Sequence, residues 1–190
     1  MNHLTTLINT YKTVFSSADI ATILGLSMRG AERFLRRSKK DGRLLNPRKG
    51  VRTLPVYNMN ELAGALFPGG YISLEPVLFQ AGVSFQYYGN TVQCIWHKNA
   101  DIFFNGQNYT ARVLKKSLYE NTTCIQEYDG YRKAMPERAL CDLVYLRPRA
   151  QFDNPQYFQT TQSEIRLKLL LPLYPKATQE YVHRIITQQI

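Results

Sequence analysis

Positively charged side chains crowd into one short stretch of the sequence, Leu26–Arg43. Seven of its 18 residues are Lys or Arg, and only Glu32 and Asp41 are acidic. Lys and Arg neutralise phosphates, and Arg also forms paired hydrogen bonds with the edge of guanine. These residue types therefore point to nucleic-acid binding, and the alternative is an ordinary helix with a solvated basic face.

The spacing of these cations predicts a helix with one basic side. At about 100° per residue, the small and apolar residues gather on one side and most of the cations on the other. The packing side carries Ala31, Phe34, Leu35 and Ser38, and the basic side carries Arg29, Arg33, Arg36, Arg37 and Lys40. Ser27 suits the N-cap position, and Gly42 suits the position after the last turn. Glu32 precedes Arg36 by four residues, a spacing that predicts one surface ion pair.

The sequence on either side of this helix predicts a winged helix-turn-helix. Upstream, Ser16 or Ser17 can cap a short apolar helix, and Gly25–Leu26 forms the turn. Downstream, two short runs on either side of NPRKG predict a hairpin that ends near Tyr57, the wing. A preceding first helix is expected to supply the core with Leu4, Leu7, Ile8, Tyr11, Val14 and Phe15.

In such a domain the second helix of the turn enters the major groove, and its N-terminal residues contact the bases. Base contacts are expected from Ser27, Met28, Arg29 and Arg33, with Gly30 allowing close approach of the backbone. Phosphate contacts, which position a protein without specifying sequence, are expected from Arg36, Arg37, Lys40, Arg48, Lys49 and Arg52.

The net charge is concentrated in the first third of the chain. Residues 1–68 contain 11 Lys and Arg against 4 Asp and Glu, whereas the remaining residues contain 13 against 10. A helix-breaking Pro68–Gly70 follows. We therefore predict two domains in the 190 residues, a winged helix-turn-helix over 1–68 and a second domain over 69–190.

The second region is typical of a mixed α+β domain with a helical tail. Ser73 is a candidate N-cap for a helix that ends at Gly82, and Pro136 and Pro148 bound another helix. Short strands are expected between these helices, at 91–96, 101–104, 109–114 and 122–126. Two tail helices, separated near 172–175, are expected to pack against this domain or to offer a protein-binding surface. The predicted fold class is α+β.

Catalytic and metal-binding patterns are weak throughout the sequence. Cys94, Cys124 and Cys141 form no C-x-x-C pair and the histidines are scattered, so no metal site or cofactor is predicted. A nuclease needs clustered acidic ligands with a lysine, and the candidates are widely spaced: Asp101, Glu120, Glu127, Asp129, Lys115 and Lys116. No apolar run approaches the ~20 residues of a membrane span, and no signal peptide is recognisable. We expect a cytoplasmic protein that is not an enzyme and binds no membrane.

Two longer motifs follow the basic N-terminal region. In GYISLEPVLFQAG, Gly70–Glu75 and Gly82 match the form G-Y-I-S-L-E-x-A-L-x-x-x-G, and Pro76–Val77 depart from it. In MPERALCDLVYLR, the matches to x-P-E-K-A-L-x-D-L-x-Y are Pro136, Glu137, Ala139, Leu140, Asp142, Leu143 and Tyr145, and Arg138 keeps the usual charge. In this order, behind a winged helix-turn-helix, the motifs resemble the AbiEi family of antitoxins over roughly residues 4–147.

The resemblance implies a bacterial type IV toxin–antitoxin protein that acts in phage abortive infection. It implies binding of double-stranded DNA at inverted repeats upstream of the protein's own operon, which two copies are expected to fill, and repression of that operon. It also implies that the C-terminal region opposes a nucleotidyltransferase-like toxin, with or without direct contact. It supplies no catalytic residues. The residues themselves predict structural roles, in which Asp142 pairs with Arg138 and Glu137 suits a helix start.

Two alternatives remain open at this stage. One is a stand-alone transcriptional regulator whose α+β domain binds a small ligand or a protein, with a pocket lined by the aromatic segments VSFQYYGN and QCIWHK. The other is an enzyme, such as the nuclease considered above, that the N-terminal domain guides to DNA.

Overall fold

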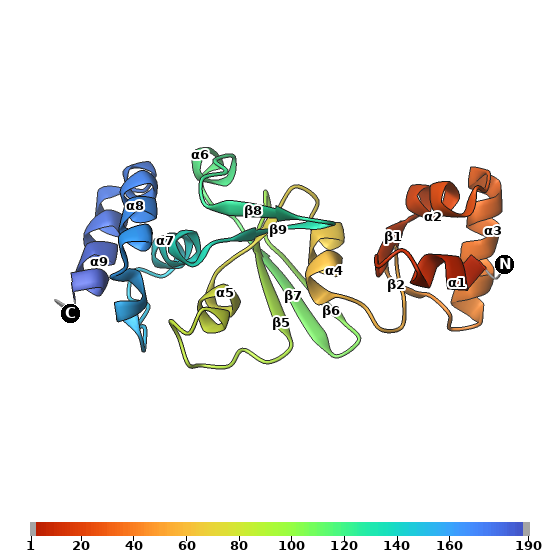
Figure 1. The fold of residues 1–190 in the computed structure, drawn as a ribbon, viewed down its shortest axis with the longest axis horizontal. Helices are drawn as coiled ribbons and strands as arrows, with labels where there is room; N and C mark the ends of the chain where they lie inside the picture. Colours follow the sequence, from red (N-terminus) through yellow and green to blue (C-terminus); the bar gives the residue numbers. More distant parts are fainter. Residues whose placement is uncertain (1–2, 188–190) are drawn as a thin grey trace. The chain divides into compact units, whose positions relative to one another are not determined.

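The structure is a computed structural model that describes residues 3–187. The chain divides into two compact units, Met1–Pro68 and Gly69–Ile190, which we call the N-terminal unit and the C-terminal unit. Helices and strands both contribute and the larger sheet is mixed, so the fold class is α+β. Figure 1 labels the elements of each unit.

The N-terminal unit combines short helices with a small antiparallel sheet. Its elements are α1 (His3–Ile8), β1 (Val14–Ser16), α2 (Ser17–Leu24), α3 (Met28–Lys40), β2 (Leu45–Arg48), β3 (Val51–Thr53) and α4 (Met59–Leu66). The strand order is β1-β3-β2. The predicted hairpin is present as β2–β3, and Gly50 at its tip has a positive φ of 85°. Its bounds differ from the prediction, because β2 continues through Asn46–Arg48 of the predicted turn and β3 ends at Thr53 rather than near Tyr57.

Hydrogen-bonded caps define the ends of α2 and α3. The Ser16 hydroxyl accepts the Asp19 N–H at 3.0 Å, and the Asp19 carboxylate accepts the Ser16 N–H at 2.7 Å. Gly25 ends α2 at φ 61°, a left-handed conformation that glycine adopts readily. Ser27 then caps α3 by accepting the Gly30 N–H at 3.2 Å. The predicted short helix, glycine turn and second capped helix are therefore confirmed.

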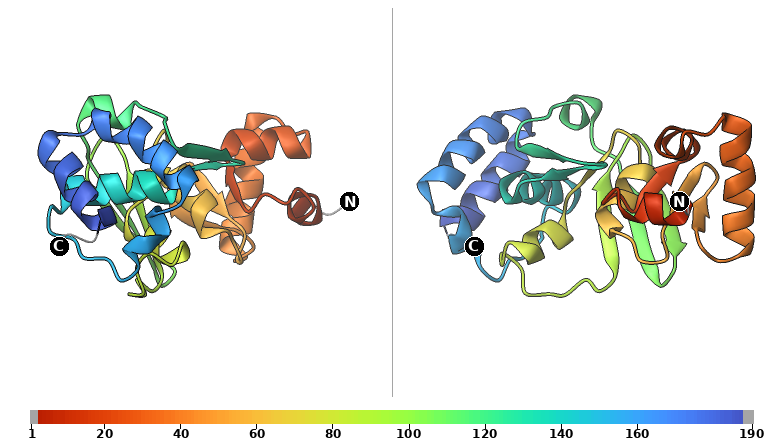
Figure 2. Two further views of the ribbon diagram at one scale, coloured as in Figure 1. Left: turned by 60° about the vertical axis from the view of Figure 1, so that its left-hand side comes forward. Right: turned by 45° about the vertical axis from the view of Figure 1, so that its right-hand side comes forward.

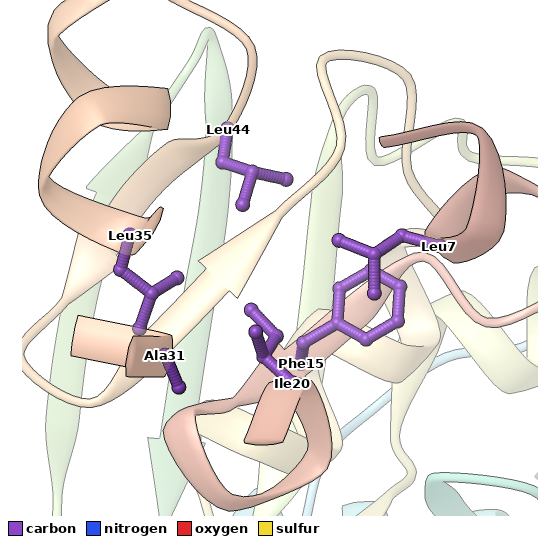
Figure 3. Packing of buried hydrophobic residues seen from close by; sticks show 6 residues of the cluster. All are labelled: Leu7, Phe15, Ile20, Ala31, Leu35 and Leu44. Atoms are coloured by element: carbon purple, nitrogen blue, oxygen red, sulfur yellow. The ribbon is translucent and has the colours of Figure 1, made fainter. Parts of the chain in front are cut away.

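The core of the N-terminal unit draws residues from most of its elements. Figure 3 shows six of them packed together: Leu7, Phe15, Ile20, Ala31, Leu35 and Leu44. Ala31 and Leu35 belong to α3, Ser38 is buried on the same helix, and Phe34 packs at the edge of the core. This is the packing side predicted for α3, so the opposite side of the helix carries the cations.

The predicted first helix is wrong in its C-terminal half. α1 ends at Ile8, and Tyr11 has φ 59° and a side chain that is 96% exposed, so it adds nothing to the core. Val14 and Phe15 are buried, but in β1, where Val14 pairs with Thr53. The apolar spacing suits a helix as well as a strand, and the partner strand that decides the outcome lies far along the chain.

The C-terminal unit is built on a six-stranded mixed sheet. Its strands are β4 (Tyr71–Ile72), β5 (Thr91–Ile95), β6 (Ala100–Phe104), β7 (Gln107–Arg112), β8 (Ile125–Tyr128) and β9 (Tyr131–Ala134). Their order is β6-β7-β5-β4-β9-β8, with β4 parallel to β9 and β5 parallel to β7. The four predicted strands correspond to β5 to β8, and the prediction missed β4 and β9.

The helices of this unit pack partly against the sheet and partly against one another. They are α5 (Glu75–Gln80), α6 (Lys116–Tyr119), α7 (Pro136–Leu146), α8 (Thr161–Leu170), α9 (Lys176–Thr187) and the 3₁₀ turns η1 (Pro155–Phe158) and η2 (Leu171–Leu173). α7 packs against β9 and α5 on one side and against α8 and α9 on the other, so it lies between the sheet and the tail (Figures 1 and 2). The two predicted tail helices are confirmed, and both pack on this unit. Over the described residues, no helix combines the length and apolar character that crossing a bilayer requires.

Candidate functional site

The basic side of α3 is the main concentration of charge in the N-terminal unit. The residues predicted to contact nucleic acid from this helix are all exposed except the partly buried Gly30: Ser27, Met28, Arg29, Arg33, Arg36, Arg37 and Lys40. Lys39 is exposed as well. Because α3 is anchored by Ala31 and Leu35 in the core, these side chains project from one fixed surface rather than from a mobile loop.

The basic side chains of α3 have no ion-pair or hydrogen-bond partner among the residues of the unit that the structure describes. Within residues 3–187, the side chains of Arg29, Arg33, Arg36, Arg37 and Lys40 form no ion pair and no hydrogen bond. The surface pair predicted between Glu32 and Arg36 is wrong, since the described residues contain no such contact. Arg43 does pair with Asp41, at 3.5 Å, just beyond the helix. The uncompensated charge therefore remains available for an external anion.

The length of this cationic row is of the same order as the width of the major groove of duplex DNA. Arg29 and Lys40 are eleven residues apart on α3, which at 1.5 Å per residue is about 16 Å along the axis. A helix can enter the major groove, which is about 12 Å wide, and place such side chains on base edges and on the phosphates of both walls. The geometry therefore suits a groove-bound helix with contacts at both its ends.

Gly30 in the first turn of α3 is not required by the unit's own packing. A Cβ atom built there would lie 3.4 Å from the Ser27 hydroxyl oxygen and 3.5 Å from the Leu26 Cβ, which is ordinary contact. The backbone conformation is helical, so alanine would also suit it. Neither the packing of the unit nor the backbone conformation therefore requires glycine at position 30.

The three predicted cations of the hairpin differ from one another. Lys49 is exposed, and its side chain forms no hydrogen bond or ion pair with any described residue. Arg48 donates through Nη1 to the Leu66 carbonyl at the end of α4, at 2.7 Å. Arg52 is partly buried and donates through Nη1 to Asn46 and to the Val51 carbonyl, and burial lowers the pKa of its guanidinium. Arg52 therefore links the two strands of the hairpin and Arg48 links the hairpin to α4, and sequence reasoning missed both roles.

The C-terminal unit contains a buried polar network that joins its two sequence motifs. Arg138 and Asp142 on α7 are both fully buried and form the predicted ion pair, with Nε to Oδ1 at 3.0 Å. The Asp142 carboxylate also accepts hydrogen bonds from the hydroxyls of Tyr71 (3.0 Å), Ser73 (2.8 Å) and Tyr174 (2.6 Å). Tyr71 and Ser73 belong to the first motif and Arg138 and Asp142 to the second, so the two motifs contact each other in the folded unit.

Arg138 is the centre of this network. Its guanidinium donates to the Tyr71 hydroxyl at 2.8 Å and to the Leu118 carbonyl at 2.7 Å, with further contacts to the carbonyls of Asn121 and Thr123. Burial would lower the pKa of Arg138, but the adjacent Asp142 carboxylate raises it overall. The predicted role of Ser73 as a helix cap is wrong, because α5 begins after Leu74 without a side-chain cap and the Ser73 hydroxyl donates to Asp142.

Two further carboxylates are buried beside this network. Glu137 is fully buried and accepts from the Ser163 hydroxyl at 2.6 Å and from Arg166 at 3.2 Å, which ties α7 to α8. Glu75 is 3% exposed and pairs with Arg147. One oxygen of each carboxylate, Oε2, has no hydrogen-bond partner among the described residues. Glu137 therefore connects α7 to α8, in addition to its predicted suitability for the start of α7.

The residues considered for catalysis or metal binding lie apart in the structure. Asp101 pairs with Arg112 and Glu120 with Lys116, while Glu127 and Asp129 lie on the exposed hairpin of β8 and β9. Over residues 3–187 there is no group of three His, Cys, Asp or Glu side chains placed to hold a metal ion.

The cysteines fill space in the C-terminal unit. Cys94, Cys124 and Cys141 are free thiols, and Cys94 and Cys141 are buried. Burial raises the pKa of both buried thiols, which keeps them protonated and unreactive.

The expectation that aromatic segments line a pocket is met only in part: of the aromatic residues of VSFQYYGN, Tyr88 lines a pocket, whereas the side chains of Phe85 and Tyr87 are exposed. Ser84, Gln86 and Tyr88 of VSFQYYGN line a pocket of about 290 Å³ in the C-terminal unit, together with residues of α5, α7 and the chain after α7. The segment QCIWHK does not contribute to it; there the Trp96 and His97 rings lie 4.1 Å apart, and the Lys98 ammonium lies 5.1 Å from the Trp96 ring.

Comparison with known proteins relates the chain to a known fold but to no family. No protein-family model matches it, and no curated protein matches it. Among solved structures, the crystal structure of the RV2827C protein from Mycobacterium tuberculosis is similar, with a TM-score of 0.58 over 97% of this chain and 74% of that chain. The two sequences are 13% identical, so the similarity is one of fold.

Proposed function

We propose that the N-terminal unit is a winged helix-turn-helix that binds double-stranded DNA, with α3 as the recognition helix and β2–β3 as the wing. The observation that carries this proposal is the basic side of α3, whose cations are exposed and unpaired within the described residues while its other side is anchored in the core. In a helix whose only role is to face solvent, some of the Lys and Arg side chains are expected to pair with neighbouring Asp or Glu residues.

Roles within the interface follow from position on α3. The N-terminal turn carries Ser27, Met28 and Arg29, with Arg33 one turn later, and these residues read bases at the floor of the groove. Arg36, Arg37 and Lys40 lie further along and bind phosphates, which orient the protein without specifying sequence. Lys49 is the phosphate contact of the wing, since Arg48 and Arg52 already bind inside the unit.

The biological role that best fits such a module is that of a type IV antitoxin of the AbiEi kind. In this proposal two copies occupy inverted repeats upstream of the operon and repress it, in the bacterial cytoplasm. The C-terminal unit counteracts a nucleotidyltransferase-like toxin. The supporting observation is that the two motifs of the AbiEi resemblance form one buried network, so they act as a structural signature of the C-terminal unit.

DNA binding is tested by fluorescence anisotropy with the full chain and the duplex that lies upstream of its own reading frame. A scrambled duplex of equal length and composition is the control, and both are titrated at several salt concentrations. We expect the upstream duplex to bind about 10³-fold more tightly, with a steep salt dependence. Equal, weak binding of both duplexes would contradict sequence-specific recognition.

Two arginine substitutions on α3 separate the proposed roles. Arg29→Ala is expected to cost about 1–3 kcal/mol and to relax specificity at one base pair, because it removes a paired contact to guanine. Arg36→Ala is expected to weaken all duplexes alike and to lower the salt slope by about one unit. Lys168→Ala, an exposed cation of α8, is the matched control. The assignment is wrong if Arg29→Ala and Arg36→Ala behave identically.

A second candidate function is a stand-alone regulator whose C-terminal unit binds a small ligand. The pocket that Glu75 helps to line favours this second function. The same pocket is also compatible with an antitoxin that responds to a metabolite. Deletion of the neighbouring gene separates the two functions, because an antitoxin becomes dispensable without its toxin whereas a stand-alone regulator does not.

A further inference from the structure

The basic helix α3 contains one acidic side chain, that of Glu32. The helix carries six Lys and Arg, and Glu32 is the fifth of its 13 residues. The residue is exposed, and its carboxylate forms no ion pair and no hydrogen bond with any described residue. Arg29 and Arg36 lie three residues before it and four residues after it, spacings at which side chains on a helix meet, yet neither is paired with it. The fold of the N-terminal unit therefore does not require a carboxylate here.

Glu32 lies on the part of α3 that is proposed to contact bases. At about 100° and 1.5 Å per residue, it is roughly 60° around the helix from Arg29 and about 4.5 Å further along the axis. Arg33, the other arginine proposed to read bases, is the next residue. Ala31 and Leu35 hold these turns against the core, so the backbone at Glu32 has a fixed position. A helix that places Arg29 and Arg33 on base edges therefore brings Glu32 to the same stretch of the groove.

A carboxylate at this position has two effects on DNA binding. The phosphates of any duplex repel it, so it lowers affinity irrespective of sequence. It also accepts hydrogen bonds and donates none. In the major groove the donors are N4 of cytosine and N6 of adenine, and adenine places its N7 acceptor beside the amino group, whereas guanine and thymine offer only acceptors. Cytosine is therefore the base that best accommodates Glu32.

We propose that Glu32 selects a cytosine in the DNA site of α3, by accepting a hydrogen bond from the N4 amino group of that base. The proposal rests on the DNA binding proposed above. Where another base occupies the position, the carboxylate loses water without gaining a donor, and its repulsion from the phosphates is uncompensated. The arginines of α3 raise the affinity for every duplex, whereas Glu32 lowers the affinity for duplexes that lack this cytosine.

Selection of binding sites from a library of random duplexes tests the base preference. The full chain is compared with two variants, Glu32→Gln and Glu32→Ala. We expect the unaltered protein to enrich cytosine at one position of the selected site. Glu32→Gln is expected to shift the enrichment at that position to adenine, because a glutamine amide donates to N7 and accepts from N6 of adenine. Glu32→Ala is expected to lose the preference at that position and to keep the preferences elsewhere.

Fluorescence anisotropy measures the accompanying change in affinity, with the selected duplex and a scrambled duplex as probes. Glu32→Ala is expected to bind the scrambled duplex about threefold more tightly and the selected duplex about threefold more weakly, so the ratio of the two affinities falls about tenfold. Glu164→Ala is the matched control, since it removes an exposed carboxylate of α8 that also forms no ion pair with any described residue. This control is expected to leave the ratio unchanged.

Thermal unfolding followed by circular dichroism shows that the variants are folded. Glu32→Ala removes no contact with a described residue, and alanine favours a helix. Both Glu32 variants are therefore expected to unfold at the temperature of the unaltered protein.

The outcomes separate the role of Glu32 from DNA recognition itself. If the unaltered protein enriches no sequence, recognition by α3 is wrong and the role of Glu32 is wrong with it. If the unaltered protein enriches a site and both Glu32 variants keep the same base preferences, only the role of Glu32 is overturned. A fall in the affinity ratio that is equally large in Glu164→Ala also overturns that role.

Discussion

Asp142 offers a sharp test of the buried network in the C-terminal unit. Its two carboxylate oxygens accept hydrogen bonds from Arg138, Tyr71, Ser73 and Tyr174 at 2.6–3.0 Å, and neither Asp142 nor Arg138 is exposed to solvent. Asp142→Asn replaces one accepting oxygen with a donating nitrogen. It also leaves the Arg138 guanidinium buried without its counter-charge.

The magnitude of the loss follows from this arrangement. Removing one partner of a buried ion pair costs about 3–5 kcal/mol, because the remaining charge stays desolvated. Domains have total stabilities of about 5–15 kcal/mol, so Asp142→Asn is expected to remove about a fifth or more of the stability of the C-terminal unit. With a urea slope near 2 kcal/mol per molar, the unfolding midpoint falls by about 2 M.

Trp96 makes this measurement specific to the C-terminal unit. It is the only tryptophan in the chain and is buried beyond the end of β5, so its fluorescence follows unfolding of that unit alone. Asp101→Asn is the matched control, since Asp101 pairs with Arg112 at an exposed site and is expected to cost less than about 1 kcal/mol. A loss below about 1 kcal/mol in Asp142→Asn as well would refute the view that this network stabilises the unit.

Further outcomes follow from the N-terminal unit. Ser27→Ala removes the α3 cap and is expected to cost about 1 kcal/mol in thermal unfolding followed by circular dichroism, whereas Ser27→Asp keeps the cap. Lys49→Ala is expected to lower the salt slope of DNA binding by about one unit with no loss of thermal stability, whereas Arg52→Ala is expected to destabilise the hairpin. Burial raises the pKa of Asp19, but its hydrogen bonds with Ser16 and the Lys12 ammonium hold it below its usual range overall. The stability that Asp19 contributes is therefore present above about pH 4 and lost below it, and the difference in unfolding free energy from Asp19→Asn should shrink as the pH falls to about 3.

Local signals explain why α3 and its surroundings could be predicted from the sequence. The Ser27 cap, the left-handed Gly25 and the tip of the hairpin at Gly50 depend on residues within a few positions of one another. The packing side of α3 follows from helical spacing alone, and the exposed cations follow from it in turn. The candidate DNA interface is therefore largely a local property of the chain.

The parts that the sequence concealed depend on distant partners. Val14 and Phe15 become a strand because β3 lies beside them, and nothing in their own spacing excludes a helix. Ser73 has the residue type of a helix cap, yet Asp142, 69 residues later, takes its hydroxyl. Arg52 is different, because its partner Asn46 lies only six residues earlier across the hairpin; the charge of Arg52 alone suggests a DNA contact, and the pairing of β2 with β3 brings the two side chains together instead.

The place of Tyr174 in the network has a consequence for how the protein is made. The N-terminal unit needs no residue beyond Pro68 for its own sheet and core, so it can fold as soon as that segment leaves the ribosome. The C-terminal unit cannot complete its buried charges until Tyr174, 106 residues later, reaches Asp142. At synthesis rates of about 5–20 residues per second, the first unit precedes the second by roughly 5 to 20 s. For that interval the nascent chain carries a finished basic surface, and over roughly its last third, once Asp142 has been made, Arg138 and Asp142 still depend on water for their solvation.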